Sequence, residues 1–107
     1  MSFKIREGEK EDMTSVLKLI KELAHFEKEP EAVIVTVEDL QKDGFCNNPL
    51  FKTFVAEIDN EIIGMALFYP RYSTWKGPTI HLEDLIITKS KRGLKIGSAL
   101  YAKIIEY

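Results

Sequence analysis

The chain has 107 residues, enough for one domain that buries about 65% of its unfolded surface in a single core. With 45% hydrophobic residues, 30% charged residues and a formal net charge of -2, it has the composition of a globular protein and lacks the basic excess of a nucleic-acid binder. No apolar run is long enough to span a membrane, the N-terminal residues lack signal-peptide features, and the lone Cys46 excludes an internal disulfide. We therefore expect a cytoplasmic protein.

The N-terminal part predicts one strand and two helices. Phe3 and Ile5 alternate with polar residues, as in a short strand. The apolar residues between 13 and 24 then recur at helical spacing. Thr36 and Asp39 form a capping-box pattern, which predicts the start of a second, shorter helix.

The middle of the chain predicts three strands. Residues 51–58 and 62–69 flank a turn signal, "DNE", and read as an antiparallel hairpin. Gly64 within the second strand indicates a bulge or a close backbone approach. Residues 70–78 are expected to form a loop. Residues 79–88, "TIHLEDLIIT", predict a third strand that is apolar on both faces towards its end and therefore central in the sheet.

The last segment predicts a helix whose apolar face carries Ile96, Ala99, Leu100, Ile104 and Tyr107. The order of elements is then β-α-α-β-β-β-α, an α/β (α+β) fold with a mostly antiparallel sheet flanked by helices. Because the sequence stops with this helix still running, we expect a single domain over 1–107 that lacks its C-terminal part.

The stretch "SKRGLKIGSAL" between Ser90 and Leu100 is a candidate anion site. Backbone N–H groups at the start of a helix lack intrahelical partners and attract anions. Gly93 and Gly97 let the backbone approach a ligand closely, and positive charge comes from Lys91, Arg92 and Lys95. Neither the dinucleotide nor the Walker pattern is present. Taken alone, the stretch is equally compatible with a solvated turn.

Two adjacent acids, Glu83 and Asp84, interrupt the third strand and should face opposite sides of the sheet. An acid within an apolar strand is costly to bury and usually has a partner or a task. A carboxylate whose pKa is raised by burial can act as a general base, directly or through a water. The alternative is one structural acid and one surface acid.

Together, "HLEDLIITKSKRGLKIGSAL" resembles the central strand, loop and helix of the GNAT acetyltransferases. The segments "LIKELAHFE", "TVEDLQKDGF", "YSTWKG" and "LEDL" are similar to the diamine acetyltransferase branch, which holds the spermidine/spermine and thialysine N-acetyltransferases. The resemblance implies a homodimer that moves an acetyl group from acetyl-CoA, without a metal, to a primary amine. The amine would be thialysine or a lysine-like amino acid, a diamine or a polyamine.

The resemblance also implies roles for individual residues. Glu83 would take the proton from the substrate ammonium through a water, and Phe26 and Glu27 would face the substrate. Ser73 and Thr74 would also contact the substrate, and Trp75 would line its cleft or cover the sheet. Acetyl-CoA would bind main-chain groups of Leu85, Ile86 and Ile87, and its pyrophosphate would bind the loop residues Arg92, Gly93, Leu94, Lys95, Ile96, Gly97 and Ser98.

The chain departs from the family pattern in three places. Lys95 replaces a glycine, which is tolerated if the backbone there is already helical, and its ammonium would then reach a CoA phosphate. Ser73 replaces an acid of the polyamine-preferring members, which should favour shorter amines. The tyrosine that acts as general acid belongs after Tyr107. This makes a non-catalytic CoA-binding or dimerisation module the main alternative, with an acetyltransferase of protein termini as a third.

Overall fold

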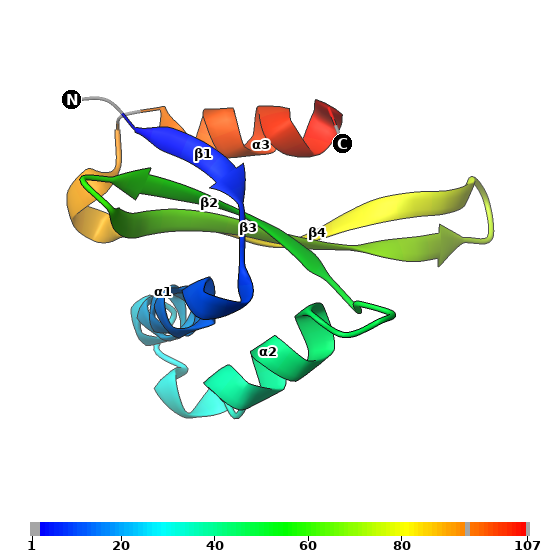
Figure 1. The fold of residues 1–107 in the computed structure, drawn as a ribbon, viewed down its shortest axis with the longest axis horizontal. Helices are drawn as coiled ribbons and strands as arrows, with labels where there is room; N and C mark the ends of the chain where they lie inside the picture. Colours follow the sequence, from blue (N-terminus) through cyan, green and yellow to red (C-terminus); the bar gives the residue numbers. More distant parts are fainter. Residues whose placement is uncertain (1–2, 94, 107) are drawn as a thin grey trace.

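A computed structural model describes residues 3–93 and 95–106, and its elements follow the predicted order (Figure 1). The α/β class, with a sheet flanked by helices, is confirmed. The strands and helices are β1 (Lys4–Glu7), α1 (Met13–Phe26), α2 (Val37–Gly44), β2 (Lys52–Ile58), β3 (Glu61–Ser73), β4 (Gly77–Ile87) and α3 (Ile96–Glu106), and the short 3-10 turns are η1 (Lys10–Asp12), η2 (Pro30–Ala32) and η3 (Lys89–Lys91).

The described sheet has four strands in the order β1-β2-β3-β4, and every neighbouring pair is antiparallel. In Figure 1, α1 and α2 lie on one face of the sheet and α3 lies on the other. Each face has its own hydrophobic core. The core under α1 includes Met13, Val16, Val55, Met65 and Ile86, and the core under α3 includes Ala56, Ile63, Ala66, Ile96 and Leu100.

The predicted capping box at the start of α2 is confirmed. The Thr36 hydroxyl accepts a hydrogen bond from the Asp39 backbone N–H (3.1 Å), and the Asp39 carboxylate accepts one from the Thr36 N–H (2.9 Å). The two bonds satisfy N–H groups that have no acceptor within the helix. Leu40 then packs into the core under α1.

The predicted β2–β3 hairpin is also confirmed. Its turn residues Asp59 and Asn60 have φ values of 52° and 66°, which suits a tight turn between twisted strands. Gly64 shows both of the features that were expected of it. A register shift lies beside it between Ala56 and Glu57, and a Cβ atom at Gly64 would lie only 2.6 Å from Cδ1 of Ile87.

The predicted loop over residues 70–78 is wrong. β3 continues to Ser73 and β4 begins at Gly77, so only three residues connect the strands. Pro70 lies within β3, but beyond Phe68, the last residue of β3 that pairs with β2. Its missing N–H therefore interrupts no bond between β2 and β3, as is usual for proline in a strand without a second neighbour.

The prediction that the third strand is central is also wrong, because β4 lies at the edge of the described sheet. Its apolar end has a different cause. Ile86 belongs to the core under α1, whereas Ile87 packs against the core under α3. Helices cover both faces of the sheet at this end, so both faces of the strand are apolar there.

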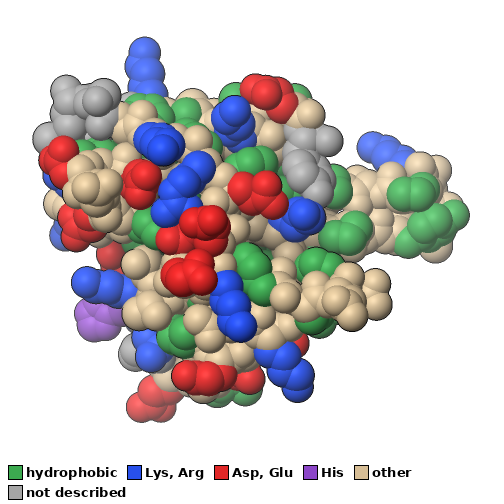
Figure 2. All heavy atoms as spheres, viewed as in Figure 1, with side chains coloured by type: hydrophobic (Ala, Val, Ile, Leu, Met, Phe, Trp, Pro, Cys, Tyr) green, Lys and Arg blue, Asp and Glu red, His purple; other side chains and the backbone are tan. Residues whose placement is uncertain are grey.

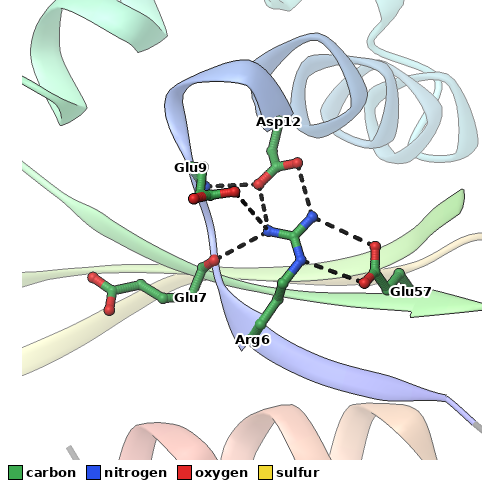
Figure 3. Close-up of polar contacts among 5 residues, drawn as sticks. All are labelled: Arg6, Glu7, Glu9, Asp12 and Glu57. Carbon is green, nitrogen blue, oxygen red and sulfur yellow. Dashed lines mark hydrogen bonds and ion pairs between the residues drawn. The ribbon is translucent and has the colours of Figure 1, made fainter. Parts of the chain in front are cut away.

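Arg6 joins β1, η1 and β2 in an ion-pair network (Figure 3). Its guanidinium makes two hydrogen bonds to the Asp12 carboxylate, of 2.7 and 3.0 Å, and a longer contact of 3.5 Å to Glu57. The bond from Arg6 is the main reason that the pKa of Asp12 lies below its usual value, and the same bond raises the pKa of Arg6. The network thus fixes the approach of the chain to α1.

Candidate active site

Glu83 lies in a bulge of β4. In the register with β3, Leu67 pairs with Asp84 and Phe68 pairs with Leu82, so Glu83 is an extra residue without a partner position. The expectation that the two acids face opposite sides of the sheet depended on regular alternation, which the bulge interrupts. Bulges are common beside active sites, where they redirect a side chain.

The bulge brings acidic side chains together with the end of α1. Asp84 is half-buried, and its pKa is raised first by burial and then by the negative charges of Glu83 and Glu27. Glu27 caps α1, its N–H bonding to the Leu23 carbonyl at 2.9 Å. We call Glu27, Glu83 and Asp84 the acidic site. It presents several negative charges within electrostatic reach of one another, which suits a cationic ligand.

The raised pKa expected for an acid of this strand therefore belongs to Asp84. The Glu83 side chain is 53% exposed, and its Oε1 lies 3.6 Å from Nε2 of His81. An exposed carboxylate beside an imidazole is accessible to water and to a substrate ammonium. Within the described parts of the chain, no group of three or more His, Cys, Asp or Glu side chains is arranged to hold a metal ion.

The loop between β4 and α3 forms a shallow hollow of about 320 Å³. It is lined by Ile87, Lys91, Arg92, Gly93, Lys95, Ile96, Gly97 and Ser98. The structure thus gathers the described residues of the predicted pyrophosphate loop around one concave surface. Leu94, which belongs to the same prediction, lies outside the described residues.

The expectation that the backbone at Lys95 is helical is wrong. Its φ is 63°, in the left-handed region, and α3 begins one residue later. Gly93 also has a positive φ, of 90°. A side chain costs about 1 kcal/mol or more in this conformation, which explains why glycine would suit position 95. Lys95 is therefore accommodated at a cost in backbone strain.

The hollow fits the phosphate groups of a CoA molecule by the chemistry of its donors. No described residue accepts a hydrogen bond from the backbone N–H groups of Gly97 and Ser98, which open α3. A Cβ atom at Gly97 would meet nothing within 4 Å, so the surface there is open to a ligand. Helix N-termini of this kind bind phosphate, and the surrounding lysines and arginine add positive charge.

The end of β4 lies directly beside this hollow. β4 pairs with β3 on one side, and no other described strand pairs with its second side. Ile86 is buried, Leu85 is 39% exposed, and the Ile87 carbonyl accepts a hydrogen bond of 3.1 Å from Nε of Arg92. An open strand edge can pair with the amides of an extended ligand.

Arg92 connects the loop to the end of α1. Its guanidinium lies 5.4 Å from the centre of the Phe26 ring, within the range of a cation–π contact. Phe26 is 65% exposed and directly precedes Glu27 of the acidic site. The basic loop and the acidic site therefore adjoin one another.

Comparison with known proteins identifies the family to which this arrangement belongs. Residues 13–107 match the acetyltransferase (GNAT) family. The chain belongs to this family. It is 39% identical to thialysine N-epsilon-acetyltransferase of Bos taurus over 110 residues, which cover 95% of this chain and 65% of that protein. It is 37% identical to spermidine/spermine N(1)-acetyltransferase-like protein 1 of Homo sapiens over 109 residues, which cover 95% of this chain and 16% of that protein.

The fold agrees with solved acetyltransferases. An aminoglycoside acetyltransferase from an uncultured soil metagenomic sample, crystallised with sisomicin, has a TM-score of 0.76 and 25% identity over 97% of this chain and 68% of that chain. The GNAT fold and the family predicted from the sequence are thereby confirmed. The chain spans less than two thirds of the Bos taurus and Homo sapiens relatives' lengths. In the described residues no helix is both long and apolar enough to span a membrane.

Three predicted substrate residues of this GNAT chain lie far from the acidic site. Ser73, Thr74 and Trp75 form the tip of the β3–β4 hairpin, which projects away from the helices (Figure 1). From Gly77 to Glu83 the strand extends about 20 Å. Hydrophobic side chains gather on the projecting hairpin (Figure 2), and Trp75 is 95% exposed. Trp75 therefore neither covers the sheet nor lines a cleft within the described chain.

Glu22 fixes the start of the loop between β4 and α3, a role that was not predicted from the sequence. Its carboxylate accepts hydrogen bonds from the Thr88 hydroxyl (2.8 Å) and the Lys89 backbone N–H (2.9 Å). In the sequence, Glu22 is one acid on the polar side of an amphipathic helix and gives no local signal of this role. The contact joins residues that are 66 and 67 positions apart.

Proposed function

We propose that this chain belongs to an acetyl-CoA-dependent N-acetyltransferase that acts on a primary amine of a small substrate. The observation that supports the proposal most directly is the contact between Arg92 and Phe26, because it joins the basic loop after β4 to the end of α1, where the acidic site begins. The phosphates of a CoA thioester are negatively charged, whereas a protonated amine is positively charged. A site for the negative cofactor beside a site for the positive amine would bring the two reactants together.

The residues of the chain have separate tasks in this proposal. The loop amides from Arg92 to Ser98 would hold the pyrophosphate, and the end of β4 from Leu85 to Ile87 would hold the pantetheine. Bound acetyl-CoA supplies the acetyl group as a thioester. The loop and the strand edge would orient this group towards the acidic site.

At the acidic site, Glu27 and Asp84 would attract the substrate ammonium. Glu83 would accept its proton through a water, because an amine cannot attack a thioester while it is protonated. The neutral amine nitrogen would then attack the thioester carbonyl carbon directly, in a ternary complex. The C–N bond forms as the C–S bond breaks, and CoA leaves as a thiolate that takes up a proton from solvent.

The substrate that we propose is thialysine or a lysine-like amino acid, with diamines and polyamines as alternatives. The Bos taurus relative is named thialysine N-epsilon-acetyltransferase, and the Homo sapiens relative is named spermidine/spermine N(1)-acetyltransferase-like protein 1. Ser73 offers no negative charge to a long polycation. We therefore expect shorter amines to be preferred.

We also propose a homodimer. Within one chain, the hairpin tip with Ser73 lies about 20 Å along β4 from Glu83. The tip residues can therefore serve the same substrate only if a second copy supplies them. Sedimentation equilibrium should give twice the mass of the chain, and a monomer that is fully active would contradict this part of the proposal.

The test of the proposed activity is the release of CoA thiol from acetyl-CoA in the presence of thialysine, lysine, diamines and polyamines. The expected result is release that requires one of these amines, together with a mass increase of one acetyl group on the amine. Binding of acetyl-CoA without release, for every amine, would favour the non-catalytic CoA-binding module instead.

A further inference from the structure

We propose that Glu22 is a positioning residue that holds the loop between β4 and α3, here called the phosphate loop, in the geometry required for CoA binding. This inference rests on the proposed function. Glu22 lies on α1, and each of its carboxylate oxygens accepts a hydrogen bond from the loop side. Oε1 accepts from Oγ1 of Thr88, and Oε2 accepts from the backbone N–H of Lys89.

Because of these and neighbouring bonds, the first N–H groups of the loop donate to acceptors within the protein. The Thr88 N–H also donates to the Ile63 carbonyl (2.8 Å), and the Lys91 N–H donates to the Thr88 carbonyl (3.0 Å). The loop amides near β4 are thus largely used within the protein. The Gly97 and Ser98 N–H groups at the start of α3 have no acceptor among the described residues, and a helix N-terminus favours an anion.

The same helix contacts the loop at a second point. Phe26 follows Glu22 by four residues, so the two side chains lie on the same face of α1. Phe26 contacts the Arg92 guanidinium at 5.4 Å, while Glu22 holds the segment that precedes it. Through Glu22 and Phe26, α1 restrains both ends of the turn between Thr88 and Arg92.

The negative charge of Glu22 makes this role testable against a simple alternative. A carboxylate near a phosphate site should weaken anion binding if charge alone matters. Removing it would then tighten CoA binding. If Glu22 acts through Thr88 and Lys89, its removal should weaken CoA binding, because the loop amides lose their fixed arrangement.

The experiment compares Glu22→Ala and Glu22→Gln with the wild type by calorimetric titration with CoA and by steady-state kinetics. We expect Glu22→Ala to lower CoA affinity and to raise KM for acetyl-CoA by about tenfold, with kcat and the KM for the amine nearly unchanged. Glu22→Gln keeps an acceptor oxygen but loses the charge, so it should show a smaller loss. Glu31→Gln, an exposed acid of η2, is the matched control and should show no change.

Thr88 variants test the same contact from the other side, and they remain informative if Glu22→Ala does not fold. Thr88→Val removes the hydroxyl donor and should weaken CoA binding, whereas Thr88→Ser keeps the donor and should restore it. The effects of Thr88→Val and Glu22→Ala should be less than additive, because both variants break the same hydrogen bond.

Equal or tighter CoA binding in both Glu22 variants, with a wild type that binds CoA, would overturn the role of Glu22 and leave the proposed function intact. A lower melting temperature with unchanged CoA affinity would also overturn it, because that result indicates only a structural contact. A wild type that does not bind CoA would overturn both the proposed function and this inference.

Discussion

At the scale of single residues, Lys95 combines a strained backbone with a positive charge in the proposed phosphate site. Its φ of 63° is a conformation that glycine adopts without strain. The sequence reveals that a lysine replaces a family glycine, but it does not reveal the backbone angle. The ammonium of Lys95 lines the same hollow as Arg92 and can offer charge to a phosphate.

Lys95→Gly is therefore expected to have two opposite effects. The free energy of unfolding should rise by about 1 kcal/mol, because the left-handed backbone is no longer strained. The affinity for acetyl-CoA should fall, because a positive charge is lost from the phosphate site. Urea unfolding and calorimetric titration measure the two effects separately. Lower stability would contradict the backbone argument, and tighter binding would show that the lysine is an obstacle.

Asp84 shows a similar balance, because its negative charge lowers stability. Burial and the neighbouring acids raise its pKa in the folded chain. The stability gained from protonating it is present below its unfolded pKa and is lost as the pH rises through its folded pKa. Ionised Asp84 is therefore destabilising at neutral pH, which is a cost that an amine-binding role would explain.

Asp84→Asn should accordingly raise the free energy of unfolding at neutral pH, by less than about 1 kcal/mol because solvent screens a half-exposed group. The gain should fade as the pH falls below about 4, where the aspartate is protonated in both states. Urea unfolding at several pH values tests this expectation, with Glu31→Gln as the control. Meanwhile the KM for the amine should rise. A loss of stability at neutral pH would contradict the account.

At the scale of elements, Gly64 and Gly97 lie on the two sides of the region that we propose binds acetyl-CoA. Gly64 lies under the end of β4, where an added Cβ atom would be 2.6 Å from the Ile87 side chain and 3.1 Å from the Ile86 carbonyl oxygen. Gly97 opens α3, where an added Cβ atom would meet nothing within 4 Å. Packing requires a glycine at position 64, whereas the backbone at Gly97 is open to a ligand.

Gly64→Ala should lower the free energy of unfolding by about 1–3 kcal/mol, because the carbonyl of Ile86 cannot move freely. Gly97→Ala should leave stability unchanged or raise it by up to about 1 kcal/mol, because alanine is the better helix former. Its CoA affinity should fall if the ligand approaches the backbone there. Thermal unfolding of both variants checks the contrast, and equal losses of stability would contradict it.

The network around Arg6 gives an element-scale prediction about acid stability. The pKa of Asp12 is lowered in the folded chain, so its contribution is present above its unfolded pKa and is lost as the pH falls through its folded pKa. Asp12→Asn should cost about 1–3 kcal/mol at neutral pH, because it removes a charge-assisted partner of Arg6. The difference from the wild type should shrink as the pH falls through the folded pKa of Asp12. A difference that does not vary with pH would mean that the ion pair contributes nothing.

At the scale of the whole molecule, local signals predicted the elements but not their positions in space. The capping box at Thr36 and the turn at Asp59 depend on neighbouring residues, so they could be read from the sequence. The edge position of β4 and the contact of Glu22 with Thr88 depend on distant residues, so they could not. The bulge at Glu83 depends on pairing with β3 and was missed for the same reason.

For the same reason, only the continuous parts of the candidate site could be predicted from the sequence. The continuous loop from Arg92 to Ser98 was recognisable, and the structure places its described residues around one hollow. Glu27 and Asp84 come from separate elements, and only the fold shows that their charges interact. The hairpin tip at Ser73 was assigned by resemblance, and in one chain it lies apart from Glu83.

The central claim is that Glu83 acts on an amine beside bound acetyl-CoA, and a comparison of the wild type with Glu83→Gln tests it most directly. The measurement is amine-dependent release of CoA thiol, together with the dissociation constant of acetyl-CoA. We predict release by the wild type, a rate lowered about 100-fold or more in Glu83→Gln, and an unchanged dissociation constant. Full activity of Glu83→Gln, or a wild type that binds acetyl-CoA without any amine-dependent release, would contradict the account.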